Sequence, residues 1–472
     1  MWEGNVRSRS ARILAVLAAV GLLTVSCGSR VDTDEAGDQS FGGEAPESDG
    51  GGGEVAEGEV SLEDDLFGTL ESPCGPTPDD MELTDPGVQG VTADSITVAT
   101  IADPGGPVPG LNQGIFDSMD AFADWCNDQG GINGRELIVE QLDAAILQYR
   151  ERVLEACDFA FALVGGGGTL DQLGAQEAVD CGLVDVAGFT VSPQKAESDR
   201  LYQPQPNPIS EYLVGAAQWM YEQDPDAAQY GASLYTNVET TETQQRKHQE
   251  AYESVGFDFV YDSAVNINEV NWAPTVVAMR DAGVEYLTLT SSYEEGVNLL
   301  KAMSEQGFDP TFVDFEANFY NPEFPPAAGG AAEGAYVRIT IWPFEDADQN
   351  PATQEYLQAL RATNGDDTEP ELLGAQSFSA GLMFATAMKE LGDDISREAL
   401  LEELSTITEW DGGGLHGTSN PAENKSAGCF VLMEVVGDGF ERVHPDEGLD
   451  CSEDNLDPVE GDYGAGAAES GS

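Results

Sequence analysis

The chain has 472 residues and carries 87 acidic against 19 basic side chains, a formal net charge of −68 at pH 7. Such a surface repels polyanions, so the composition excludes nucleic acid as a partner and argues against anionic lipid surfaces. With 41% hydrophobic residues, the chain can bury one large or two medium cores.

The N-terminus reads as a secretory signal. Three arginines precede an apolar run over residues 13–25, and the run is too short for a bilayer that needs roughly 20 residues. The stretch ending at Cys27 resembles a bacterial lipobox. It implies a signal peptide over 1–27 and a lipid anchor on Cys27 at the outer face of the cytoplasmic membrane. An ordinary signal peptide remains the alternative, because Thr24 stands where leucine is usual.

Two segments are too acidic and glycine-rich to form a core. Residues 28–91 include four consecutive glycines among Asp, Glu, Ser and Pro, and residues 452–472 are similar. Such a composition buries too little apolar surface to offset the entropy of ordering. We expect a disordered tether over 28–91 and an acidic tail over 452–472.

Short apolar runs alternate with helical segments through the middle of the chain. This alternation predicts doubly wound α/β sheets, and two successive series predict two Rossmann-like lobes. The first series comprises strands at 95–101, 136–141, 159–164 and 183–187, with helices at 113–127, 147–157 and 171–181. The second comprises strands at 230–235, 257–262, 286–290 and 311–314, with helices from 208 to 222 and at 243–255, 272–282 and 294–306.

Ligands of open α/β sheets bind beyond the carboxyl ends of the strands, so the loops there are candidate sites. Gly167, Gly168 and Thr169 follow one predicted strand, where free N–H groups and a hydroxyl suit a carboxylate. Gly188 and Thr190 follow the next strand and offer similar groups. A structural glycine turn is the alternative for both loops.

Two further candidates follow strands of the second series. Glu316 could bind an ammonium group through charge-assisted hydrogen bonds, and Tyr293 follows the neighbouring strand. In so acidic a chain, position alone does not distinguish Glu316 from other carboxylates.

Three segments resemble type I periplasmic binding proteins, in particular the branched-chain amino-acid (leucine/isoleucine/valine-binding) group. They are residues 127–135 (NDQGGINGR), 90–96 (GVTADSI) and 330–336 (GAAEGAY). The resemblance implies two lobes joined by three crossings near 206–210, 337–343 and 405–412. The first lobe would comprise 92–207 and 341–408, and the second 208–340 and 409–451.

The resemblance also assigns roles. It implies that the loop ending at Thr169 binds a ligand carboxylate, that Glu316 binds the α-ammonium, and that Tyr293 lines the pocket. Leu111 and a position near Thr240 stand where the family has tyrosines, so the ligand can differ from leucine, isoleucine and valine. Other amino acids, short amides and aromatic acids remain open.

A solute-binding protein of this kind implies a small-molecule ligand, hinge closure around it and delivery to ABC permease subunits. We expect a monomer that carries no cofactor or metal. A surface lipoprotein that senses its ligand and signals is the alternative, and the sequence does not separate the two.

Six cysteines besides Cys27 form an even set, as expected of disulfides outside the cytoplasm. Four of them belong at the edge where strands enter the first sheet, and two flank a predicted hairpin at Gly437–Gly439. The predicted pairs are Cys157–Cys181, Cys429–Cys451 and Cys74–Cys126. A metal site is the competing interpretation, but no Cys-x-x-Cys spacing supports it.

An enzyme is the rival class of protein. His248, His416 and His444 show no metal-ligand spacing, and no Gly-x-Ser-x-Gly motif occurs. The sequence therefore favours a binding protein.

Overall fold

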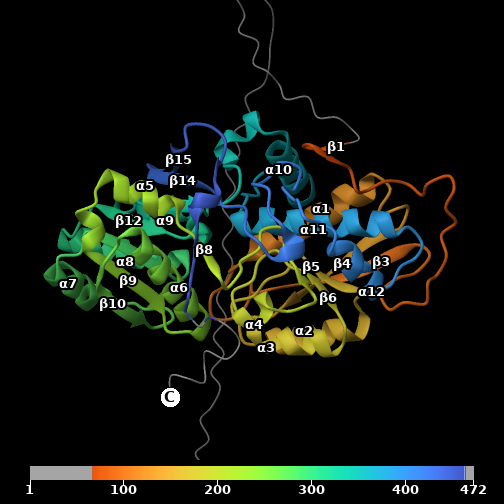
Figure 1. The fold of residues 1–472 in the computed structure, drawn as a ribbon, viewed down its shortest axis with the longest axis horizontal. Helices are drawn as coiled ribbons and strands as arrows, with labels where there is room; N and C mark the ends of the chain where they lie inside the picture. The colour runs from red at the N-terminus through yellow and green to blue at the C-terminus, as the bar shows by residue number, and fades with distance from the viewer. Residues whose placement is uncertain (1–65, 462, 464–472) are drawn as a thin grey trace, which may run out of the picture. The chain divides into compact units, whose positions relative to one another are not determined.

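The computed structural model describes residues 66–461 and 463. The predicted signal peptide, the lipobox Cys27 and residues 28–65 of the predicted tether lie outside this part of the chain. Within it, two large sheets form, each with helices packed against it (Figure 1). This is the expected α/β fold with two lobes.

The first sheet is parallel throughout, in the order β4-β3-β5-β6-β7. Its strands are β3 (Ser95–Ala102), β4 (Glu136–Asp143), β5 (Ala162–Val164), β6 (Val184–Val186) and β7 (Leu201–Tyr202). Its helices are α1 (Gln113–Asp128), α2 (Tyr149–Phe159), α3 (Gln172–Asp180), α4 (Pro193–Ala196), α10 (Pro351–Asn364), α11 (Leu372–Leu391) and α12 (Arg397–Leu404).

Strand β3 is buried on both faces over most of its length, which explains why it carries no charge and is rich in apolar and β-branched residues. Ile96 and Val98 pack in the cluster that contains side chains of α1 and α11, whereas Ala99 and Ile101 pack with those of α2 and α3. The period of two along the strand thus assigns alternate residues to opposite helix layers.

The second sheet has the order β10-β9-β11-β12-β13-β14-β15, with β16 paired to β14. Strands β9 to β13 are parallel and β14 to β16 are antiparallel. The strands are β9 (Gly231–Thr236), β10 (Phe259–Val265), β11 (Tyr286–Thr290), β12 (Phe312–Phe315), β13 (Tyr336–Ile339), β14 (Cys429–Val436), β15 (Gly439–His444) and β16 (Asp450–Cys451).

Helices also cover this sheet on two sides: α5 (Gly215–Gln223), α6 (Glu239–Val255), α7 (Ala273–Ala282), α8 (Tyr293–Gln306) and α9 (Phe324–Ala328). Tyr286 of β11 packs in the cluster with Tyr252 of α6. Its neighbour Leu287 packs in the cluster with Met279 of α7 and Leu299 of α8.

Residues next to the predicted crossings at 206–210 and 405–412 contact each other and the predicted crossing at 337–343. Gln205 donates from Nε2 to the Thr340 carbonyl at 2.8 Å, and Ser419 donates from Oγ to the Pro204 carbonyl at 2.5 Å. Ile341 and His416 form an isolated antiparallel bridge. The segments between the two sheets therefore form one hydrogen-bonded group.

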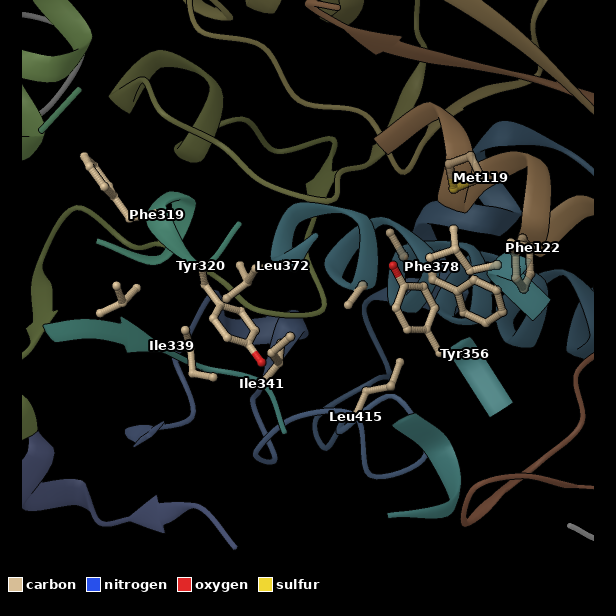
Figure 2. Close-up of a cluster of buried hydrophobic side chains, with 14 of the residues drawn as sticks. Met119, Phe122, Phe319, Tyr320, Ile339, Ile341, Tyr356, Leu372, Phe378 and Leu415 are labelled. Carbon is tan, nitrogen blue, oxygen red and sulfur yellow. The ribbon is translucent and has the colours of Figure 1, made fainter. Parts of the chain in front are cut away.

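Aromatic side chains tie the helices of the first lobe together. Phe378 of α11 lies 5.3 Å from Phe122 of α1 and 5.4 Å from Tyr356 of α10, between ring centroids. Figure 2 shows these three rings gathered in one cluster. Phe67 stacks on Phe378 at 5.2 Å.

The predicted tether and tail extend too far into the chain. Strands β1 (Leu66–Phe67) and β2 (Leu70–Glu71) form a hairpin whose Phe67 is fully buried. At the other end, β17 (Leu456–Pro458) pairs with β8 (Glu211–Leu213). In each acidic segment a few apolar side chains pack against the folded body. The average composition of a long segment does not reveal these few residues.

All six cysteines of the described chain form disulfides: Cys74–Cys126, Cys157–Cys181 and Cys429–Cys451. These are the pairs that the positions of the cysteines at strand entries and around the hairpin predict.

Among residues 66–461 and 463, every helix is too short or too polar to cross a membrane.

Candidate functional site

A cavity of about 470 Å³ is lined by residues of both lobes. Its polar lining comes mainly from positions at or just beyond the carboxyl ends of parallel strands, where α/β sheets bind ligands. Such residues are Thr190 and Gln203 on the first lobe and Thr236, Thr290 and Glu316 on the second.

Glu316 lies in the cavity wall directly after β12, as predicted. The Tyr212 hydroxyl donates to its Oε1 at 3.4 Å. Burial raises the pKa of Glu316, while the positive charge of Arg338 and hydrogen bonds from Thr290 and Tyr212 act in the opposite direction. A partly buried carboxylate in this position would gain a charge-assisted hydrogen bond from a ligand cation.

Thr169 and Thr190 line the first-lobe side of the cavity. The N–H of Thr169 is not free, because it donates to Oδ2 of buried Asp103 at 2.7 Å. The hydroxyl of Thr190 donates to Oε1 of Gln203 at 3.0 Å. The hydroxyl oxygen of Thr190 can therefore still accept a hydrogen bond from a ligand. The backbone N–H of Thr169, which the sequence suggested as a donor to the ligand, is already used.

The predicted glycines lie behind the cavity wall, outside the set of residues that line it. A Cβ on Gly167 would meet the Phe189 ring at 2.2 Å, and one on Gly168 would meet the Tyr149 ring at 2.5 Å. A Cβ on Gly188 would meet the Gly165 carbonyl oxygen at 2.6 Å. These contacts explain the glycines by close packing of the loops.

Tyr293 lines a separate, smaller hollow of about 50 Å³ beside Glu371. Its hydroxyl donates to Oε2 of Glu323 at 2.8 Å. Glu371 accepts from the N–H of Gly114 and from Nδ2 of Asn321, both at 3.3 Å. The structure thus places Tyr293 near the cavity but outside its lining.

Glu371→Gln tests the electrostatics of this hollow. Burial, with Asp117 and Glu323 nearby, raises the pKa of Glu371 to about 7. Between the ordinary pKa of a glutamate and pH 7, Glu371 is protonated in the folded state but ionised in the unfolded state. The free energy of unfolding therefore falls as pH rises through this range, and this contribution to stability is lost above pH 7. We expect the wild type to lose about 2 kcal/mol relative to the variant between pH 5 and pH 8, measured by urea unfolding. Exposed Glu369→Gln is the control, and an equal pH profile in both variants would contradict the assignment.

Apolar side chains complete the cavity and reach its rims. They include Leu111, Ile146, Leu147, Phe189, Val238, Ile267 and Leu373. Leu111 lines the cavity at a position where the sequence indicated an altered pocket. The other such position was placed near Thr240, whose Oγ1 donates to the Thr169 carbonyl at 3.1 Å and so links the two lobes.

Three residues of the site were missed by sequence reasoning. Arg338, in the middle of β13, and Gln203, beside β7, both line the cavity. Asp103 lies directly after β3, at a strand end that the same rule would have marked. The signal for Arg338 was available too, since it is a cation inside an apolar strand of a chain with few cations.

Comparisons with known proteins agree with this geometry. Residues 95–440 match the periplasmic binding protein family. The leucine-specific-binding protein of Salmonella typhimurium is 24% identical over 324 residues, which cover 64% of this chain and 80% of that protein.

Solved structures share the fold at low identity. A fatty acid ABC transporter substrate-binding protein from Thermomonospora curvata has a TM-score of 0.66 and 15% identity, covering 81% of this chain and 97% of its own. An R. palustris ABC transporter solute-binding protein in complex with 4-hydroxybenzoate has a TM-score of 0.63 and 12% identity, covering 76% and 97%. The chain belongs to the periplasmic binding protein family, whose members bind solutes and are not enzymes.

Proposed function

We propose that this protein is an extracytoplasmic solute-binding lipoprotein of an ABC importer, which captures an amino acid or a related small carboxylate or amide. The observation that carries the proposal is the cavity of about 470 Å³ between strand ends of both lobes. It combines three carboxylates and one guanidinium with several hydroxyls and amides and an apolar remainder, and such a mixture of apolar surface and placed polar groups is usual in a small-molecule site.

The relatives support a ligand of this class. The curated relative is named for leucine, and the two structures are named for a fatty acid and for 4-hydroxybenzoate. All three ligands carry a carboxylate, whereas their remaining parts differ widely. The shared chemistry favours a small carboxylate, and Glu316 favours one that also carries an ammonium group.

The proposed mechanism is closure about the three crossing segments. Ligand would enter between the lobes, and closure would bring the wall that contains Glu316 against it. Exclusion of water strengthens charge pairing in the closed cavity. A permease could then distinguish loaded from empty protein by shape, and the proposed lipid on Cys27 would keep the protein beside it.

A thermal-shift screen tests the proposal. The compounds are the twenty L-amino acids, their primary amides, and straight-chain and aromatic carboxylates. A ligand at 100 times its Kd adds about 2.7 kcal/mol to the unfolding free energy, so a true ligand raises Tm by several degrees.

Matched Ala→Trp variants locate the binding. Ala317 lines the cavity, whereas Ala282 ends α7 and lies outside the lining. Ala317→Trp should abolish the shift, and Ala282→Trp should keep it. No shift with any compound, or a shift that survives Ala317→Trp, would refute the proposal.

A further inference from the structure

Arg338 is a buried cation with unused hydrogen-bonding capacity in the cavity wall. It is 9% exposed, and its Nε donates to Oδ1 of Asp314 at 2.7 Å. Its Nη2 is buried and has no hydrogen-bond partner among the described residues. A guanidinium carries five N–H donors in a planar fork that matches a carboxylate, and a buried donor without an acceptor is costly.

Arg338 and Glu316 stand beside each other on this wall. The parallel register of β12 and β13 pairs Phe315 with Val337. Glu316 and Arg338 are the next residues along each chain, and neighbouring strands lie about 4.8 Å apart. Both residues line the cavity, so an acid and a base face it from adjacent strands.

Arg338 is the one positive charge among several negative charges in the described lining of the cavity. Its lining contains three carboxylates, Glu211, Glu295 and Glu316. Among the described residues that line the cavity, Arg338 is the one lysine or arginine. A ligand carboxylate entering such a cavity would be repelled unless it paired with this guanidinium.

The first-lobe loop is poorly suited to an anion. Oδ2 of Asp103 takes the Thr169 N–H at 2.7 Å, and Oδ1 takes the Ile146 N–H at 2.8 Å. Asp103 is fully buried against the loop. A second carboxylate brought there by a ligand would find the Thr169 N–H occupied and would face a like charge.

We propose that Arg338 binds the carboxylate of the ligand, so that Glu316 and Arg338 together hold the ammonium and the carboxylate of an α-amino acid on the second-lobe wall. This deepens the proposed function and rests on it. It moves the carboxylate from the glycine loop, where the sequence predicted it, to a residue of β13. The apolar side chains on the opposite side of the cavity would then receive the ligand side chain.

Calorimetry with matched ligands tests the assignment. The probes are each L-amino acid that shifts the wild-type Tm and its primary amide, which keeps the ammonium but lacks the carboxylate charge. We expect the wild type to prefer the acid by about 30-fold or more. In Arg338→Lys, which keeps a cation beside Asp314, and in Arg338→Gln combined with Asp314→Asn, the preference should fall below about threefold. Circular dichroism and Tm check that each variant is folded.

Two first-lobe variants keep the test decisive if the Arg338 variants do not fold. Thr169 lines the cavity and Asp103 holds its N–H, so Thr169→Ala and Asp103→Asn can change overall affinity, but the ratio of acid to amide affinity should stay within about threefold of the wild-type ratio. The proposal is overturned if the preference survives in folded Arg338 variants, collapses in Thr169→Ala, or rises in Asp103→Asn, because each result points to the first-lobe loop. Absence of binding by every probe to the wild type would instead remove the proposed function, and this assignment with it.

Discussion

Glu316→Gln should weaken binding of an ammonium-bearing ligand by about 30-fold or more, measured by calorimetry with the amino acid that the thermal-shift screen identifies. Glu316 is a partly buried carboxylate in the wall of a cavity that closure would dry, and removal of one partner of a desolvated charge pair costs roughly 2–5 kcal/mol. Glutamine keeps an oxygen that can accept from Tyr212, so the folded wall should change little.

Glu211→Gln provides the matched control for this substitution. Glu211 also lines the cavity and loses the same charge, but its Oε1 accepts from the N–H of Ser426 at 3.1 Å. We expect this variant to lose less than about threefold, through the weaker general field alone. Equal losses in both variants would show that the cavity attracts the ligand through net charge and that Glu316 makes no specific contact.

Phe378→Ala should lower the free energy of unfolding by about 3–5 kcal/mol, measured by urea denaturation followed by circular dichroism. The ring is fully buried and contacts Phe67, Phe122, Trp125 and Tyr356. Removing it leaves a cavity among four large rings from three segments, β1, α1 and α10, and such rings have little freedom to collapse into the gap.

Phe378→Leu is the milder substitution at the same position. It retains much of the buried volume and should cost less than the alanine variant, about 1.5 kcal/mol. A loss below about 1.5 kcal/mol for the alanine variant would contradict the close packing seen around this ring, because it would mean that its neighbours rearrange to fill the space.

The architecture was predictable because buried parallel strands have a recognisable sequence pattern. Runs such as residues 95–101 and 286–290 are short, free of charge and rich in β-branched and apolar residues, and both appear as strands, β3 and β11. The short strands β7 and β8 escaped prediction, since two or three residues carry no periodic signal. The buried hairpin at Phe67 escaped because its partners lie far along the chain.

The site was less predictable than the fold. A strand end marks a candidate position, and Glu316, Thr169 and Thr190 do line the cavity. It does not reveal whether a donor is already used, and the occupied N–H of Thr169 depends on Asp103, 66 residues earlier. Nor does it show which side of a turn faces the cavity, which decided the place of Tyr293.

The two disulfides nearest the ends of the folded body bear on how this protein can be shortened for production. The family match spans residues 95–440, which excludes Cys74 and Cys451 but retains their partners Cys126 and Cys429. A protein trimmed to that span would present two unpaired thiols, able to attack the remaining Cys157–Cys181 bond or to crosslink molecules. It would also lack β1 and β17. An expressed chain that begins between residues 28 and 66 and ends at or after residue 461 keeps all six of these cysteines with their partners.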